Sequence, residues 1–133
     1  MKTICIIPAR GGSKGIKLKN LQKIGGKPLL YYPISAAKRS KVCDLIFVST
    51  DSNKIAKAAK KFGAEVPFLR KKSFSKDFTT TEETLKHALI EAENYYNIRF
   101  DICIFLTCTN PFRKVEWIKN SVQGLKRNKK IDS

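Results

Sequence analysis

Residues Thr3 to Gly15 read TICIIPARGGSKG, an apolar run that ends at Pro8 and passes directly into a basic, glycine-rich segment. Uninterrupted apolar character is typical of a strand that is covered on both faces, as in a parallel sheet flanked by helices. Thr3–Pro8 is therefore predicted to be such a strand. In open α/β sheets, ligands bind beyond the carboxyl ends of the strands, so the segment Ala9–Asn20 is the first candidate for a binding site.

The rest of the chain repeats an alternation of short apolar runs and longer amphipathic stretches. This alternation predicts an α/β fold with a mostly parallel sheet and helices on both faces. Two further strands are predicted at Asp44–Ser49 and Asp101–Leu106. Helices are predicted at Leu29–Arg39, Ser52–Phe62, Thr81–Asn97 and Val115–Arg127.

Local signals suggest where several of these helices begin and end. Gly63 is expected to close the helix that ends at Phe62. Pro28 suits a first helical turn, whereas Pro33 should delay the start of that helix or kink it. Thr80 and Glu83 have the spacing of a capping box at the start of the third helix.

Composition limits the classes of protein that the chain can belong to. The net charge is +16, from 27 basic and 11 acidic residues among 133, which favours a polyanionic partner such as a nucleotide or a nucleic acid. The excess is mostly lysine, as expected of a solvated surface, and no nucleic-acid-binding signature accompanies it, so a nucleic-acid partner is disfavoured. The apolar runs are too short to span a membrane and no signal peptide is evident, so a cytoplasmic location is expected. The four cysteines form no C-x-x-C pair, which argues against zinc and disulfides.

The segment after the first predicted strand has the chemistry of a phosphate-binding loop. Glycines let backbone N–H groups approach an oxyanion closely, and Arg10, Lys14 and Lys19 can neutralise phosphate charge. The spelling matches neither G-x-x-x-x-G-K-[ST] nor G-x-G-x-x-G, so a P-loop ATPase or a dinucleotide site is disfavoured. A basic surface turn remains the alternative interpretation.

Several motifs, in order, resemble one family across essentially the whole chain. IPARGGSKGIKLKN at Ile7–Asn20, followed by IGGKPLLYYPI at Ile24–Ile34, looks like the opening of the acylneuraminate cytidylyltransferase (CMP-sialic acid synthetase) family. VSTDS, GAEVPFLR and LTCTNPFR follow where that family has related motifs. The resemblance implies a three-layer, Rossmann-like nucleotidyltransferase fold, of which residues 1–133 would be the N-terminal, CTP-binding portion.

The resemblance also implies an activity. In this family the anomeric hydroxyl of a nonulosonic, sialic-acid-like sugar attacks the α-phosphorus of CTP, pyrophosphate leaves, and Mg²⁺ assists. Enzymes for the related sugar acid KDO have a different opening loop, so GGSKG favours the nonulosonic-acid branch. The particular sugar stays open.

Site residues are carried over by position in these motifs. Lys19 and Arg10 match catalytic, charge-stabilising positions, and Thr107, Thr109 and Arg113 match sugar-binding ones. The family commonly has glutamine at the position of Thr107, which puts that contact in doubt. Asp51 is interpreted as a helix N-cap, and Thr80 or Thr81 as nucleotide contact or helix cap. The nucleotide-binding positions are Ala9, Arg10, Gly11, Gly12, Ser13, Lys14, Asn20, Arg70, Thr79 and Thr81.

Other family features have no counterpart in the sequence. The acidic pair that holds the family's Mg²⁺ and the segment that forms its homodimer both belong to its second half, so no metal ligand is assigned here. We therefore expect a truncated form that binds nucleotide weakly and catalyses poorly. The alternatives are a non-catalytic nucleotide-binding remnant and, less favoured, a basic nucleic-acid-binding domain.

Overall fold

Parallel strands on both sides of β1 form the main sheet. The computed structural model describes residues 2–13, 16–17, 19–70, 81–108 and 120. Within them the sheet has the order β6-β1-β7, with β1 at Thr3–Pro8, β6 at Leu45–Ser49 and β7 at Ile102–Phe105. β1 pairs in parallel with both neighbours, Ile4 lying opposite Leu45 on one side and Cys103 on the other. All three strands predicted from the sequence are confirmed; β6 begins one residue later than predicted, and β7 is one residue shorter at each end.

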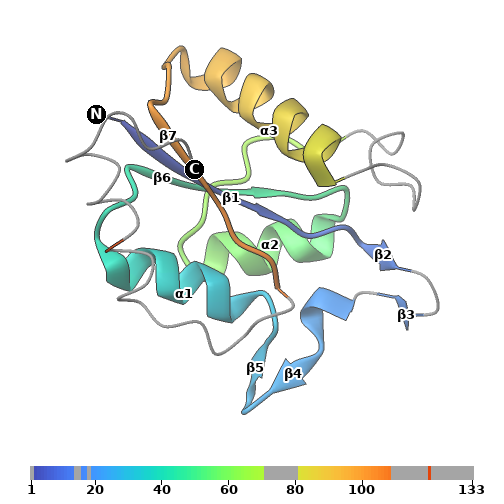
Figure 1. Ribbon diagram of the computed structural model, residues 1–133. Coiled ribbons are helices and arrows are strands. Elements are labelled where there is room, and N and C mark those ends of the chain that lie inside the picture. The colour runs from blue at the N-terminus through green and yellow to red at the C-terminus, as the bar shows by residue number, and fades with distance from the viewer. Residues whose placement is uncertain (1, 14–15, 18, 71–80, 109–119, 121–133) are drawn as a thin grey trace.

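Helices cover both faces of this sheet. α1 at Tyr31–Ser40 and α2 at Asn53–Lys61 lie on one face, and α3 at Thr81–Tyr96 lies on the other (Figure 1). The three layers confirm the predicted α/β class. Within the described residues, no helix is both long and apolar enough to cross a membrane.

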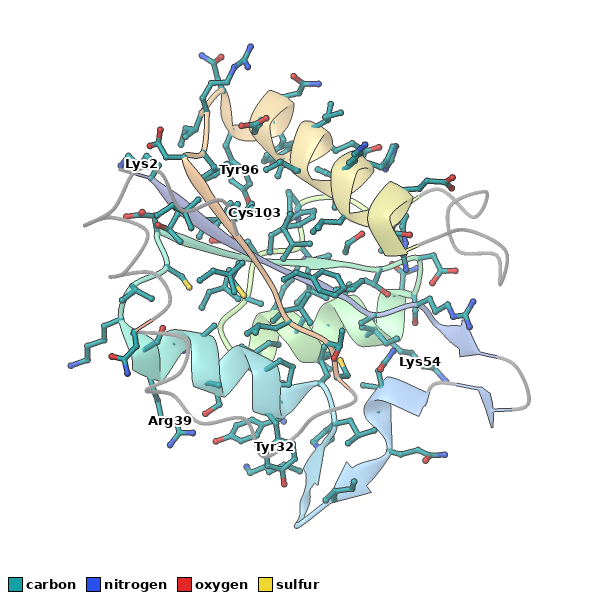
Figure 2. The ribbon with its side chains drawn as sticks, viewed as in Figure 1. Lys2, Tyr32, Arg39, Lys54, Tyr96 and Cys103 are labelled. Carbon is teal, nitrogen blue, oxygen red and sulfur yellow. The ribbon has the colours of Figure 1, made fainter. Side chains whose placement is uncertain are left out.

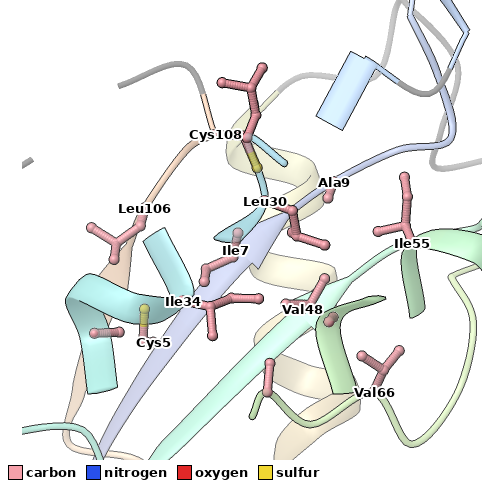
Figure 3. Close-up of a cluster of buried hydrophobic side chains, with 14 of the residues drawn as sticks. Cys5, Ile7, Ala9, Leu30, Ile34, Val48, Ile55, Val66, Leu106 and Cys108 are labelled. Atoms are coloured by element: carbon pink, nitrogen blue, oxygen red, sulfur yellow. The ribbon is translucent and has the colours of Figure 1, made fainter. Parts of the chain in front are cut away.

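Successive side chains of β1 point to opposite faces of the sheet, so the strand contributes to two hydrophobic cores, one between the sheet and each helical layer. Cys5 and Ile7 point toward α1 and α2, where they join Ile34 and Ile55 in one buried cluster (Figure 3). Ile4 and Ile6 point the other way, into a second cluster completed by Phe47 and by Ala88 and Ala92 of α3. Because β1 is buried on both faces, its sequence is apolar at nearly every position.

The two prolines predicted near the start of α1 lie in different elements. α1 begins at Tyr31, so Pro33 lies in its first turn, where a missing N–H leaves no intrahelical bond unmade. Pro28 does not belong to that turn, contrary to the prediction. It lies in β5 (Lys27–Pro28), which pairs with β4 (Lys23–Ile24) as a hairpin around Gly25 and Gly26, both at positive φ.

α2 and α3 end near their predicted limits. Gly63, at φ 102°, follows the last residues of α2 as the predicted glycine cap. α3 ends at Tyr96, one residue earlier than expected, with Asn97 at φ 54°. Thr80 and nearly all of the predicted helix Val115–Arg127 lie outside the described residues.

Candidate nucleotide site

Three connecting segments leave the sheet at the same edge. Ala9–Gly11 follows β1, Thr50–Ser52 follows β6, and Leu106–Cys108 follows β7. The pairing continues briefly beyond the strands, because the Ala9 N–H donates to the Ser49 carbonyl at 2.9 Å and the Leu106 N–H to the Ile6 carbonyl at 3.1 Å. The chain runs from β1 to β6 on one side and later to β7 on the other, so this edge is a topological switch point. Ligands of open α/β sheets bind at such points.

Gly11 is held against the turn that follows β6. Its N–H donates to the Asp51 carboxylate, with 2.7 Å between N and Oδ1. A β-carbon on Gly11 would lie 2.9 Å from the β-carbon of Ser52, so any larger residue would push the two segments apart. The glycine is therefore required here by close approach to a neighbouring segment, and its own N–H is already engaged.

The prediction that Asp51 caps a helix is wrong. The N-cap of α2 is Ser52, whose hydroxyl accepts a hydrogen bond from the Ile55 N–H at 3.3 Å. Ser52 has the extended backbone that an N-cap requires, and the helix begins at the next residue. This leaves the Asp51 carboxylate to bind the loop after β1.

The candidate loop Ala9–Asn20 contains more regular structure than its sequence suggested. β2 (Gly12–Ser13) pairs antiparallel with β3 (Ile16–Lys17), and a 3-10 turn, η1, spans Lys19–Leu21. Asn20 ties the ends of the loop together, since its side-chain amide donates to the Arg10 carbonyl at 3.2 Å and its own carbonyl accepts from the Leu30 N–H at 2.9 Å. Lys14 lies outside the described residues, and for Ser13 and Lys19 only the backbone is described.

Arg70 brings a buried positive charge to this edge. Its backbone N–H donates to the Thr50 carbonyl at 2.7 Å, and only 7% of the residue is exposed. Its Nε has no hydrogen-bond partner within the described part of the chain. Burial lowers the pKa of Arg70, the Asp51 charge raises it and the Arg10 charge lowers it. Asp51 and Arg10 are thus both close enough to Arg70 for their charges to act on it.

The remaining predicted residues are only partly placed. Thr107 is half-buried after β7, and Thr81 is the first residue of α3. Cys108 packs into the same buried cluster as Ala9 and Leu30, which holds the end of β7 beside the start of the loop (Figure 3). Burial raises the pKa of the Cys108 thiol to about 12. Thr79, Thr109 and Arg113 lie outside the described residues.

No cluster of metal-ligating side chains is found within the described residues. Mg²⁺ is held by several oxygen ligands, whereas no group of three histidine, cysteine, aspartate or glutamate side chains gathers anywhere in the described ranges. The Asp51 carboxylate at this edge already accepts the Gly11 N–H. The absence of metal ligands elsewhere in the chain stays a prediction.

The fold and the position of the loop define a Rossmann-like α/β domain of the nucleotidyltransferase type. Residues 4–133 match the sequence profile of the family described as Cytidylyltransferase, and the chain belongs to that family.

Curated relatives are similar to this chain over most of its length. A CMP-N,N'-diacetyllegionaminic acid synthase of Legionella pneumophila is 39% identical over 123 residues, which are 92% of this chain and 53% of the relative. A pseudaminic acid cytidylyltransferase of Campylobacter jejuni is 35% identical, over 96% of this chain and 55% of the relative. An N-acylneuraminate cytidylyltransferase of Streptococcus agalactiae is 40% identical, over 92% and 29%. The chain thus spans about half the length, or less, of these relatives.

Solved structures share the fold. A CMP:2-keto-3-deoxy-manno-octonic acid synthetase complexed with CTP has a TM-score of 0.78 at 23% identity, covering 98% of this chain and 50% of that one. A cytidylyltransferase from Leptospira borgpetersenii has a TM-score of 0.73 at 25% identity, covering 98% and 51%. The first likeness supports the architecture alone.

Sequence reasoning missed the contact between Asp51 and Gly11. The two residues are 40 positions apart, and their meeting depends on the parallel register of β1 and β6. An aspartate two residues after a buried strand, at the end of the sheet where the loop emerges, was the signal available in the sequence.

Proposed function

We propose that these 133 residues are the CTP-binding portion of an enzyme that transfers CMP to a nonulosonic sugar acid. Membership of the Cytidylyltransferase family supports the reaction class. The names of the relatives, which concern legionaminic, pseudaminic and N-acylneuraminic acids, support the class of sugar.

The observation that carries the proposal is the guanidinium of Arg70, buried at the carboxyl edge of the sheet. A buried charged group is normally paired or hydrogen-bonded, yet the Nε of Arg70 lacks a partner among the described residues. An acceptor oxygen of a nucleotide would satisfy it. Arg10, beside it, adds a second positive charge at the start of the glycine-rich loop.

We assign a role in binding to the residues of each part of the site. Arg10, Lys14 and Lys19 neutralise the triphosphate, with Lys19 acting at the α-phosphate. Arg70 faces the cytidine together with Thr79 and Thr81. Gly11 contributes by allowing the close approach of the loop, because its N–H is engaged by Asp51. Thr107, Thr109 and Arg113 are assigned to the sugar acid.

The reaction is a displacement at phosphorus. The anomeric oxygen of the sugar forms a bond to the α-phosphorus, the bond from that phosphorus to the oxygen of the β-phosphate breaks, pyrophosphate leaves, and the hydroxyl proton is released. Such reactions depend mainly on positioning and charge neutralisation, which basic side chains provide. We propose that the reaction uses Mg²⁺, but no step is assigned to it, because the described residues do not hold the ion.

Binding and turnover test different parts of this proposal. Calorimetry should detect CTP binding that exceeds UTP and GTP binding, and Arg10→Ala should weaken it by more than Arg39→Ala does. Arg39 is an exposed arginine on the outer side of α1 that points away from the sheet (Figure 2). Arg39→Ala changes the net charge by the same amount as Arg10→Ala and therefore serves as the control. Equal effects of the two substitutions, or no preference for CTP, would contradict the site.

Turnover is measured as pyrophosphate release from CTP, Mg²⁺ and N-acetylneuraminate. We propose that the 133-residue chain alone turns over slowly, because the described residues offer no acidic cluster for the metal. Rapid turnover would show this part of the proposal to be wrong. Salt-sensitive binding to DNA or RNA that excess CTP does not displace would instead favour a nucleic-acid partner.

A further inference from the structure

The turn Thr50–Ser52 contacts both halves of the candidate site. On one side its Asp51 carboxylate accepts the Gly11 N–H at 2.7 Å, and its Ser52 β-carbon limits the space at Gly11. On the other side its Thr50 carbonyl accepts the Arg70 N–H at 2.7 Å. The turn is itself braced, because the Ser52 N–H donates to the Thr50 hydroxyl at 3.1 Å and Thr50 is fully buried. It therefore links the loop after β1 to the buried arginine.

We propose that Asp51 is a positioning residue for CTP, which it orders without contacting the reacting atoms. It fixes the start of the phosphate-binding loop through Gly11, and it belongs to the turn whose Thr50 carbonyl accepts the Arg70 N–H. This inference rests on the proposed function and deepens it, since it names the residue that sets the distance between the triphosphate loop and the arginine.

Charge and geometry both assign this role to Asp51. A hydrogen bond from a backbone N–H to a carboxylate is roughly twice as strong as one to a neutral acceptor, so it can hold a glycine that would otherwise sample many conformations. The charge of Asp51 acts on Arg70 in the direction opposite to the charge of Arg10. The helix-capping role that would otherwise explain an aspartate here is already filled by Ser52.

Three variants separate positioning from stability. Asp51→Ala removes the acceptor and the charge, Asp51→Asn keeps an acceptor oxygen without the charge, and Ser52→Ala removes the helix cap while keeping the β-carbon beside Gly11. In calorimetry with CTP we expect the dissociation constant to rise about tenfold for Asp51→Ala and about threefold for Asp51→Asn. Ser52→Ala should bind CTP as the unaltered chain does but unfold at a lower temperature.

A result in which folded Asp51→Ala binds CTP as tightly as the unaltered chain would overturn the inference. If Asp51→Ala does not fold, Asp51→Asn carries the same test. An equal loss of CTP affinity in Ser52→Ala and Asp51→Ala would also overturn it, because the effect would then follow stability.

A second measurement does not depend on CTP. In NMR measurements, the Gly11 amide should exchange its hydrogen with solvent more slowly in the unaltered chain than in Asp51→Ala, because the Asp51 carboxylate accepts that N–H. Equal exchange rates in the two proteins would overturn the inference. If the rates differ and CTP does not bind, the contact stands and the proposed function is wrong.

Discussion

Replacing Arg70 with methionine separates the two roles that a buried guanidinium can have, holding the fold and binding an anion. Methionine keeps most of the length of the apolar stem but has neither the charge nor the donors. The backbone bond from the Arg70 N–H to the Thr50 carbonyl is unaffected by the side chain. We expect the variant to be at least as stable as the unaltered chain and to bind CTP much more weakly.

The magnitudes follow from burial and from the unsatisfied donor. Arg70 is 7% exposed, and a buried donor left without a partner costs about 1–3 kcal/mol. Removing it should therefore leave the free energy of unfolding unchanged or raise it by up to about 2 kcal/mol, as happens when buried charges are replaced by apolar groups. Hydrogen bonds from a charged donor contribute about 1.5–3 kcal/mol, so the dissociation constant for CTP should rise roughly 10- to 100-fold.

Urea unfolding and calorimetry with CTP measure the two quantities on the same samples. Arg39→Met is the matched control, because Arg39 is exposed on α1 and its loss changes the net charge equally. Arg70→Lys keeps the charge but lacks the planar fork, so it should bind CTP with intermediate affinity. A loss of more than about 3 kcal/mol of stability in Arg70→Met, or unchanged CTP affinity, would refute the reasoning.

Three further predictions concern stability. The pKa of Cys108 is raised from 9.0 to about 12, so its contribution to the free energy of unfolding should be fully present below pH 9 and should be lost as the pH rises toward 12. In Cys108→Ala, the free energy of unfolding should depend less on pH in this range, and an unchanged dependence would contradict the prediction. Phe47→Ala should cost about 3–5 kcal/mol in urea unfolding, because the ring is 1% exposed between the sheet and α3. Gly26→Ala should cost about 1–2 kcal/mol from positive φ alone, since a β-carbon there meets nothing within 4 Å, and a neutral result would exclude that cause. Gly63→Ala should cost at least as much, because its β-carbon would also displace the Lys38 side chain.

The main sheet was predictable because its strands are short, apolar and buried on both faces. Thr3–Pro8 was placed to the residue, since an apolar run ending in proline and glycines has few other interpretations. The hairpin of Lys23–Ile24 with Lys27–Pro28 was not predicted, although adjacent glycines between two short segments are a known hairpin signal. Pro28 was assigned to a helix because proline suits both a first helical turn and an edge strand, and local sequence does not distinguish them.

The position of the candidate loop in the fold was predictable, but its contacts were not. The position of the glycine-rich loop at the carboxyl edge follows from the strand that precedes it. The pairing of Asp51 with Gly11, and the approach of Arg70 to Thr50, depend on strand register and on the path of the chain after α2. That path includes a parallel bridge between Glu65 and Phe47, which extends the sheet by a single residue pair and carries no periodic signal.

The charges at this edge favour a phosphate-bearing ligand over an empty site. The charges of Asp51 and Arg10 both act on Arg70, so two of these three groups are positive. Burial is the largest cause that lowers the Arg70 pKa, the Asp51 charge raises it, and the Arg10 charge adds a smaller lowering effect. A bound phosphate or base oxygen would oppose both lowering effects, and a ligand that binds only the folded chain stabilises it by mass action. CTP should therefore raise the unfolding temperature of the unaltered chain, and should raise that of Arg70→Met much less at the same concentration.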